Sequence, residues 1–293
     1  MENLNSRNFF EQLEKFGTKL NQSQKERILA NIQEIKTYIP KVGLFGKTGA
    51  GKSSLANALF GEKLCEISDI EACTRNPQEV ILGLGENGRI TLLDVPGIGE
   101  SRERDEEYGA LYQSILPELD LVLWLLKADE RAYATDQEFY QNFVKPHMEK
   151  GKPVLFVLNQ ADKIAPEKEW DNDNHLPSIN QQRNIENKVS SVAGVFNIST
   201  SKIIPVSASE RYNLVDLVDK IVFALPDKQK VTIVKYIDKT LISERAAADV
   251  NKSAVKAVFG GVMTGAVIGF EIGGPVGAGI GGIIGGIVGW FSR

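Results

Sequence analysis

The stretch GKTGAGKSS, at residues 46–54, combines the residue types that bind phosphate. It fits the pattern Gly-x4-Gly-Lys-Ser, follows a β-prone run and opens a helical run, which is the context of a phosphate-binding loop. Its glycines let backbone N–H groups turn toward an anion, and the helix N-terminus adds its positive end. We expect a nucleotide to be bound by Gly46, Lys47, Thr48, Gly49, Ala50, Gly51, Lys52, Ser53 and Ser54. The alternative is a glycine-rich turn that arose by chance.

Neighbouring residues suggest a site for Mg²⁺ and a reactive γ-phosphate. Lys52 would bridge β- and γ-phosphate oxygens, and Ser53 would hold the metal. In LLDVPG, Asp94 would reach Mg²⁺ through a water and the Gly97 N–H would meet the γ-phosphate. In EACTRNP, the Thr74 hydroxyl would complete the metal shell when its loop closes, unless Thr74 is an ordinary loop residue. The predicted catalytic residues are thus Lys52, Thr74 and Gly97, and the predicted metal ligands are Ser53, Thr74 and Asp94.

The run LFVLNQAD, which ends at Asp162, predicts a reader of the nucleotide base. A carboxylate there can accept both the ring N–H and the exocyclic amine of guanine. Adenine would leave it buried and unpaired, which disfavours an ATPase. Asn159 would fix the loop and approach the base edge, with Gln160 beside it in the nucleotide-binding segment. Ser207 and Ala208 would form the next loop, with the Ala208 N–H on the guanine carbonyl. The predicted ligands are GTP and GDP, and the alternative is a surface turn.

These motifs need a sheet that brings them together, and the chain contains suitable strands. Apolar or β-prone runs alternate with helical patterns, and Glu86-Asn87-Gly88 predicts one hairpin. The strand-like runs lie at 41–46, 119–128, 152–159 and 202–208. Unbroken apolar strands of this kind are typical of a parallel sheet covered on both faces. The expected fold class is therefore α/β with a mostly parallel sheet and one antiparallel edge.

Helical patterns also flank the sheet. Residues 1–39 predict one or two helices, with a capping box at Ser23 and Glu26 and an apolar stripe formed by Ile28, Leu29, Ile32 and Ile35. Another helix is expected after Thr135, capped by Thr135 and Glu138. We expect the N-terminal helices to pack against the region around 227–250 and to respond to the nucleotide, the alternative being static packing.

The C-terminal segment carries glycine at every fourth residue from Gly261 to Gly289. This spacing forms one helix stripe and allows close approach of helices, whereas so much glycine disfavours a free helix in water. The sequence GGP at 273–275 divides it into arms at about 255–272 and 276–292, each near the lower length limit for crossing a bilayer. We predict a hairpin that docks on the soluble body in one state and enters a membrane in another. The alternative is a hairpin that stays packed.

The order of motifs resembles a known family. GKTGAGKSS, CTR, DVPGIGES, NQAD and SA resemble the guanine-nucleotide motifs of the Era-like GTPases of the TRAFAC class. The stretches VGLFGKTGAGKSSLANALFG, SDIEACTRNP and LPELDLVLWLLKADERA look like the bacterial YfjP-type GTPases, and DVPGIGES also resembles immunity-related GTPases. Over residues 41 to about 225, the resemblance implies a Ras-like fold, Mg²⁺-dependent GTP binding and GTP hydrolysis.

Three positions depart from the family pattern. Gln160 replaces the usual lysine, so we expect weaker affinity with the same base. Gly49 replaces the asparagine of potassium-activated members, so potassium should have little effect. Ile98 stands where Ras-type enzymes place the water-orienting glutamine, which predicts slow intrinsic turnover. The missing group would come from a second protomer, a partner or a switch residue. Candidates are Glu100, Arg102 and Arg104, whose alternative role is that of a solvated charged loop.

Composition narrows the class of protein. The chain has 293 residues, a net charge of −4 and two cysteines. The charge does not suggest a nucleic-acid-binding surface, so no DNA partner is expected, and two cysteines disfavour a disulfide framework. The start of the chain does not have the pattern of a signal peptide, and we expect a cytoplasmic location, with peripheral attachment to or insertion in the inner membrane through the hairpin. The predicted domains are 1–40 (N-terminal helices), 41–226 (P-loop GTPase domain) and 227–293 (helical region with the hairpin at 254–292).

Two functions fit this organisation. The first is a regulatory GTPase whose nucleotide state controls assembly, including a nucleotide-dependent homodimer, or membrane association. The second is a membrane-acting interaction protein in which the GTPase domain only gates assembly of the hairpin.

Overall fold

A computed structural model describes residues 10, 11, 13, 19–47, 49–61, 79–84, 88–94, 113–260 and 262, with the backbone alone for 79–84 and 88–94. The chain divides into two compact units. The first, here called the α/β unit, comprises residues 40–225 and 236–242. The second, here called the helical unit, comprises residues 1–39, 226–235 and 243–293.

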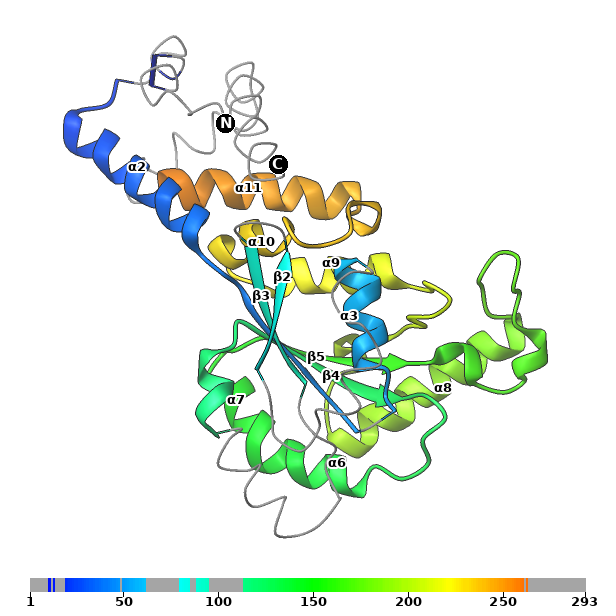
Figure 1. Cartoon of the computed structure of the whole chain (residues 1–293). Helices are drawn as coiled ribbons and strands as arrows, with labels where there is room; N and C mark the ends of the chain where they lie inside the picture. The colour runs from blue at the N-terminus through cyan, green and yellow to red at the C-terminus, as the bar shows by residue number, and fades with distance from the viewer. Residues whose placement is uncertain are drawn as a thin grey trace. The chain divides into compact units, whose positions relative to one another are not determined.

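The α/β unit is built on a six-stranded sheet of order β2-β3-β1-β4-β5-β6 (Figure 1). Its strands are β1 (Lys41–Phe45), β2 (Glu79–Leu84), β3 (Gly88–Asp94), β4 (Leu121–Lys127), β5 (Val154–Asn159) and β6 (Ile203–Pro205). β2 pairs with β3 antiparallel, and every other neighbouring pair is parallel. The predicted fold class is thereby confirmed, including its antiparallel edge. Because the strands that precede the motifs are parallel, their carboxyl ends meet at one edge of the sheet.

Helices cover both faces of this sheet, with α3 and α9 on one side and α6, α7 and α8 on the other (Figure 1). The helices are α3 (Lys52–Phe60), α6 (Ala134–Phe139), a π-helical turn (Tyr140–Val144), α7 (Lys145–Glu149), α8 (Ile179–Phe196) and α9 (Leu214–Ala224). Short 3₁₀ turns are η1 (Leu116–Glu118), η3 (Ala161–Lys163), η4 (Glu167–Glu169), η5 (Thr200–Lys202) and η6 (Lys239–Leu241). With both faces covered, β5 is buried along its whole length, which explains its unbroken apolar sequence.

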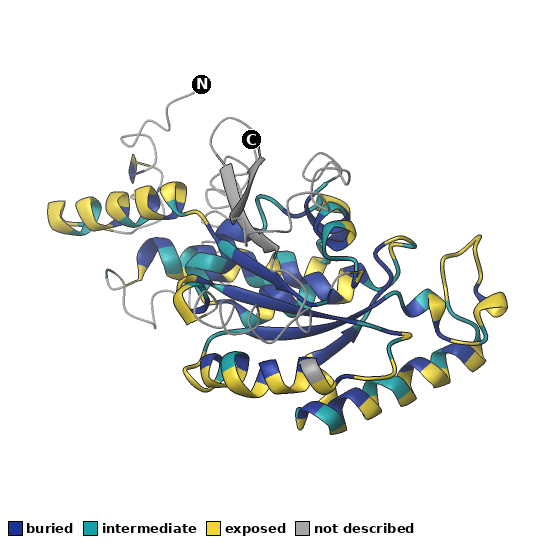
Figure 2. Ribbon diagram, turned by 60° about the horizontal axis from the view of Figure 1, so that its bottom comes forward, coloured by how far each residue is buried: buried dark blue, intermediate teal, exposed yellow. Residues whose placement is uncertain are grey.

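Aromatic side chains fill the core beneath α6, α7 and α8. The Phe156 ring lies 5.4 Å from that of Tyr140 and 5.3 Å from that of Phe196, and Trp124 stacks on Phe45 at 6.1 Å. The central strands are buried, whereas the helices are exposed on their outer sides (Figure 2). Burial of these large apolar surfaces is the main term that holds the strand ends in place.

The predicted start of the helix near 135 is wrong. α6 begins at Ala134, one residue before Thr135, and its N-cap is Tyr133, which makes no side-chain capping bond. The Gln137 N–H already donates to the Tyr133 carbonyl at 2.7 Å, so the helix is under way before Thr135. Tyr133 is buried and its hydroxyl donates to the Lys127 carbonyl at 3.2 Å. Tertiary packing of Tyr133 therefore replaces the local cap.

The helical unit contains α2 (Gln22–Thr37), α10 (Asp227–Ile233) and α11 (Glu244–Phe259). α2 contacts both α10 and α11, so the predicted packing of the N-terminal helix against the C-terminal region is confirmed. Lys228 pairs with Glu34 at 2.7 Å. The Asn31 Nδ2 donates to the Val258 carbonyl at 2.9 Å and thereby satisfies the C-terminal end of α11.

The predicted capping box of this helix is wrong, because the box begins at Asn21, before Ser23. Asn21 and Gln24 form the box, each accepting at 2.9 Å from the backbone N–H of the other. Asn21 is itself a strong N-cap residue, so the helix starts before Ser23 and the predicted pair with Glu26 does not act as its cap. Leu29 is 38% exposed, so it does not belong to the buried stripe formed by Ile28, Ile32 and Ile35.

The predicted glycine-rich hairpin lies almost entirely outside the described residues. Residues 255–259, assigned to its first arm, belong to α11, where Val258 and Phe259 are buried. Within the described ranges, no helix is both long and apolar enough to cross a membrane. Residues 236–242 belong to the α/β unit, where the Asp238 N–H donates to the Leu59 carbonyl at 2.8 Å.

Candidate nucleotide-binding site

The loop between β1 and α3 has the backbone that its glycines predict. Gly49 and Gly51 adopt positive φ angles of 81° and 85°, a region that side chains disfavour. At Gly46, a Cβ would lie 2.4 Å from the Leu125 carbonyl oxygen of β4, so only glycine fits. α3 then begins at Lys52, and its first intrahelical bond runs from Leu55 N to Gly51 O at 2.9 Å. The first-turn N–H groups lack intrahelical acceptors, as in a phosphate-binding helix N-terminus.

Lys52 lies against the backbone of this loop. Its Nζ donates to the Gly46 carbonyl at 2.9 Å and to the Lys47 carbonyl at 3.3 Å. The ammonium is half-buried and held beside the turn, where it can meet phosphate oxygens without leaving the loop. Ser53 and Ser54 follow in the first turn of α3, as predicted.

Asn159, the last residue of β5, joins this loop to the base-reading segments. It is 1% exposed, its Nδ2 donates to the Ala50 carbonyl at 2.9 Å, and its Oδ1 accepts from the Ala208 N–H at 3.1 Å. A Cβ at Gly51 would lie 2.4 Å from the Asn159 Nδ2, so glycine is needed for this approach. The Ala208 N–H is predicted to bind the guanine carbonyl. To do so, it would have to share or give up its bond to the Asn159 Oδ1.

Asp162 lies in the 3₁₀ turn η3, directly after this strand end. Among the described residues, its Oδ1 is buried and has no hydrogen-bond partner. The turn is held in place by bonds from the Ala161 N–H to the Val206 carbonyl at 3.0 Å and from Gln181 Nε2 to the Ile164 carbonyl at 3.1 Å. A buried acceptor without a donor is costly, and two adjacent N–H donors on a ligand would satisfy it.

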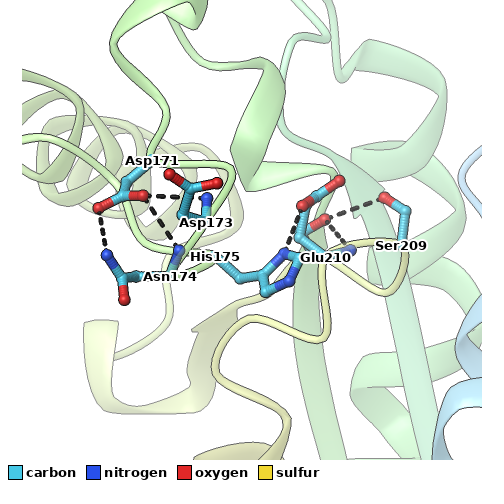
Figure 3. Close-up of polar contacts among 7 residues, drawn as sticks. Asp171, Asp173, Asn174, His175, Ser209 and Glu210 are labelled. Atoms are coloured by element: carbon cyan, nitrogen blue, oxygen red, sulfur yellow. Dashed lines mark hydrogen bonds and ion pairs between the residues drawn. The ribbon is translucent and has the colours of Figure 1, made fainter.

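The loop after β6 completes the set. Ser207 is fully buried, and its Oγ contacts the Ser209 Oγ at 3.1 Å and accepts from the Glu210 N–H at 3.3 Å. The Glu210 carboxylate in turn contacts His175 Nδ1 at 2.8 Å, on a turn that Asp171 stabilises through Asn174 (Figure 3). The loop that carries Ala208 is thus braced by a distant turn.

Comparison with known proteins agrees with this geometry. Residues 41–160 match the family described as a 50S ribosome-binding GTPase. The chain is 37% identical over 243 residues to YfjP of Escherichia coli (strain K12), covering 82% of each. The chain is an Era-like GTPase of the YfjP family. It is also 34% identical over 189 residues to GTPase Era of Aquifex aeolicus, covering 64% of this chain and 56% of Era. A crystal structure of a variant of Aquifex aeolicus Era bound to GDP.AlF4⁻ has a TM-score of 0.48 and 26% identity, covering 74% of this chain and 66% of that one.

Gln160, which stands where the family pattern has a lysine, contacts the P-loop of this GTPase. It adopts a left-handed backbone with φ 64°, and its Nε2 donates to the Gly49 carbonyl at 2.8 Å. Lys163 Nζ donates to the Gln160 Oε1 at 3.1 Å and so orients the amide. A neutral side chain can therefore tie the base-reading loop to the P-loop.

Several residues that the sequence predicts for this GTPase site lie outside the described ranges. These are Thr48, Thr74, Gly97 and Ile98, together with Glu100, Arg102 and Arg104. For Asp94 the backbone is described: it ends β3, in register with Leu44, which is two positions before Gly46. Ser53 in the first turn of α3 and Asp94 at the end of β3 both carry side-chain oxygens, the ligand type that suits Mg²⁺. Among the described residues, no group of three or more His, Cys, Asp or Glu could hold a metal.

Sequence reasoning missed Asp136, on α6. Its Oδ2 lies 2.7 Å from Lys47 Nζ and forms an ion pair with this P-loop lysine. Burial raises the pKa of the Asp136 carboxyl above its ordinary value, and Lys47 acts in the opposite direction. An aspartate in the first turn of a helix is common. No pattern in the sequence therefore distinguished Asp136 as a partner of the P-loop.

Proposed function

We propose that this GTPase binds GTP with Mg²⁺, hydrolyses it to GDP and phosphate, and uses its nucleotide state to control assembly or membrane association. The observation that carries the choice of base is the buried, unpartnered Asp162 Oδ1, next to a loop that Asn159 ties to the P-loop. Guanine offers the two adjacent N–H donors that this oxygen and its partner on the same carboxylate require, whereas adenine does not.

Hydrolysis uses the residues at the phosphate end of the site. A water oxygen attacks the γ-phosphorus and passes one proton to a phosphate oxygen, the bond to the β–γ bridging oxygen breaks, and the electron pair of that bond leaves with GDP. Lys52 stabilises the charge that develops on the phosphate oxygens, and the first-turn N–H groups of α3 orient them. Ser53, Asp94 and Thr74 would hold Mg²⁺, which neutralises charge on the β- and γ-phosphates when bound. The Gly97 N–H would contact the γ-phosphate.

The helical unit is the proposed route from nucleotide to assembly. α2 and α11 come from opposite ends of the chain, and side chains of α2 bond backbone carbonyls where α11 ends. Asn31 binds the Val258 carbonyl, and Gln24 Nε2 donates to the Val262 carbonyl at 3.3 Å. The glycine-rich segment begins at this point. A change in the position of α2 would therefore act directly on the first residues of the glycine-rich segment. Hydrogen exchange at 22–37 that differs between GDP and a GTP analogue would support this, and identical exchange would indicate static packing.

Calorimetry tests the base assignment. Wild-type protein should bind GTP and GDP far more tightly than ATP, and Asp162→Asn should shift preference toward xanthine nucleotides because the amide offers a donor to the xanthine carbonyl. Glu167→Gln, which neutralises an exposed carboxylate of the same unit, is the matched control and should keep the wild-type preference. Equal affinity of the wild type for ATP and GTP would refute the proposed base reading.

A further inference from the structure

The side chain of Lys47 binds α6, although Lys47 belongs to the P-loop. Its Nζ lies 2.7 Å from Asp136 Oδ2 and donates to the Ala132 carbonyl at 3.2 Å. The Asp136 side chain is 2% exposed and that of Lys47 is 28% exposed. The ammonium is therefore committed to the start of α6, and the contribution of Lys47 to the site comes from its backbone.

This pair differs from the surface ion pairs of the same unit. Lys41 and Glu118 also lie 2.7 Å apart, but their side chains are 39% and 64% exposed, and such exposed pairs contribute little. Asp136 is buried, and a buried carboxylate without its cation is strongly unfavourable. Asp136 therefore keeps Lys47 in one position more firmly than a surface partner could.

The backbone of Lys47 is also the support of Lys52. Its carbonyl accepts from Lys52 Nζ at 3.3 Å and from the Ala50 N–H at 3.1 Å. The side chain of Lys47 is thus held by α6. Its carbonyl in turn holds the turn of the P-loop and the catalytic lysine. A shift of Lys47 would move the acceptor on which Lys52 rests.

We infer that Asp136 is a positioning residue for GTP hydrolysis, because through Lys47 it holds the P-loop backbone that places Lys52. This inference rests on the proposed function, in which Lys52 acts on the phosphates. The pair should affect the phosphate end of the site more than the base, because Asp162 is held by separate bonds at Ala161 and Gln181. Its loss should therefore lower turnover and speed GDP release without changing the preference for guanine.

The test uses the full chain with Asp136→Asn, Lys47→Met and the double variant. The measurements are kcat and KM for GTP, the GDP dissociation rate, the GTP-to-ATP affinity ratio and the thermal unfolding midpoint. We expect each single variant to lose about 10- to 100-fold in kcat, the range that a small misplacement of a catalytic group produces. The kcat of the double variant should be no lower than that of the less active single variant, because each single substitution already removes the Lys47–Asp136 interaction. Lys47→Arg, which keeps a cation, should recover most of the rate, and Glu118→Gln should behave as wild type.

The outcomes separate this inference from the proposed function. If the wild type does not hydrolyse GTP, the proposed function fails. If the wild type hydrolyses GTP and folded Asp136→Asn has the same kcat and GDP release rate, the inference is overturned. A lower unfolding midpoint with unchanged kcat also overturns it, because the pair would then be structural alone. Should Asp136→Asn not fold, Lys47→Met/Asp136→Leu removes both charges together. A reduced kcat in that folded variant supports the inference, and a wild-type kcat overturns it.

Discussion

The Asn159 Nδ2 donates a hydrogen bond to the Ala50 carbonyl over 2.9 Å, although 109 positions separate the two residues in the chain. Through this bond the end of β5 holds the turn of the P-loop. The Asn159 side chain is buried, so neither group can turn to water if the other is removed. This bond therefore fixes the position of the base-reading loop relative to the phosphate-binding loop.

Asn159→Ala should destabilise the fold and weaken GDP binding. The Ala50 carbonyl and the Ala208 N–H would lose their partner, and each unsatisfied buried group costs about 1–3 kcal/mol of unfolding free energy. Urea unfolding and calorimetry measure the two effects. The matched control is Asn184→Ala, which removes a similar 2.8 Å amide bond to the Ala165 carbonyl at an exposed position and should cost less than about 0.5 kcal/mol. Equal costs at both positions would contradict the coupling.

Gln160→Lys should tighten nucleotide binding, and Gln160→Ala should weaken it. The alanine variant loses the bond to the Gly49 carbonyl, worth about 1 kcal/mol or roughly fivefold in Kd. The lysine variant keeps a donor for Gly49 and covers the base with a longer stem. GDP calorimetry measures both. Lys163→Met, which removes only the contact to Gln160 Oε1, is the control with a smaller effect. Tighter binding by Gln160→Ala would show that the amide does not support the base.

The buried His147 should make stability depend on pH. Burial, with contributions from Lys152 and Lys150, lowers the pKa of its imidazole from 6.5 to about 4. Below pH 6.5 the unfolded chain binds a proton at this position that the folded chain refuses, so the unfolding free energy falls as pH drops from about 6.5 to about 4. His147→Leu removes this dependence, so its stability should decline less steeply than that of the wild type over this window. Parallel curves from urea unfolding would contradict the assignment.

Turnover should be slow and should rise with protein concentration. Ile98 cannot orient water, and a group supplied by a second protomer would raise the rate, as an arginine supplied in trans does by about 10³–10⁵. A dilution series of GTP hydrolysis, with light scattering in GDP and in a GTP analogue, checks this. Constant turnover per molecule would exclude a second protomer as the source. Exchange of sodium for potassium should change the rate little, because Gly49 has no side chain for the ion.

Liposome flotation should recover the full chain in one nucleotide state. A truncation after Gly260 is the matched control, because it keeps α11 intact and removes the glycine-rich segment. We expect the truncated protein to remain unbound. Ser53→Asn tests whether binding needs the nucleotide: retained binding would favour the interaction protein gated by its GTPase domain. Full-length protein that stays unbound with every lipid and nucleotide would exclude the membrane role, and insolubility of the truncation would then indicate a packed hairpin.

The sequence alone determined the nucleotide site as a set of strand ends. GKTGAGKSS binds through consecutive backbone groups, and NQAD follows a strand that ends at a polar residue. Both features can be read from consecutive residues in the sequence. The alternation of apolar strands and helices then decided the fold class, because a sheet covered on both faces needs unbroken apolar strands.

Tertiary structure decided what holds these motifs in place. Lys47 meets the start of α6 because β1 pairs with β4, and no local pattern links residues 85 positions apart. It also decided that Tyr133 begins α6, since buried packing at Tyr133 outweighed the cap expected at Thr135. The start of α2 at Asn21, by contrast, rests on a local capping box with Gln24. A local motif specifies which atoms can react, whereas their orientation depends on contacts between distant segments that exist only once the sheet has formed.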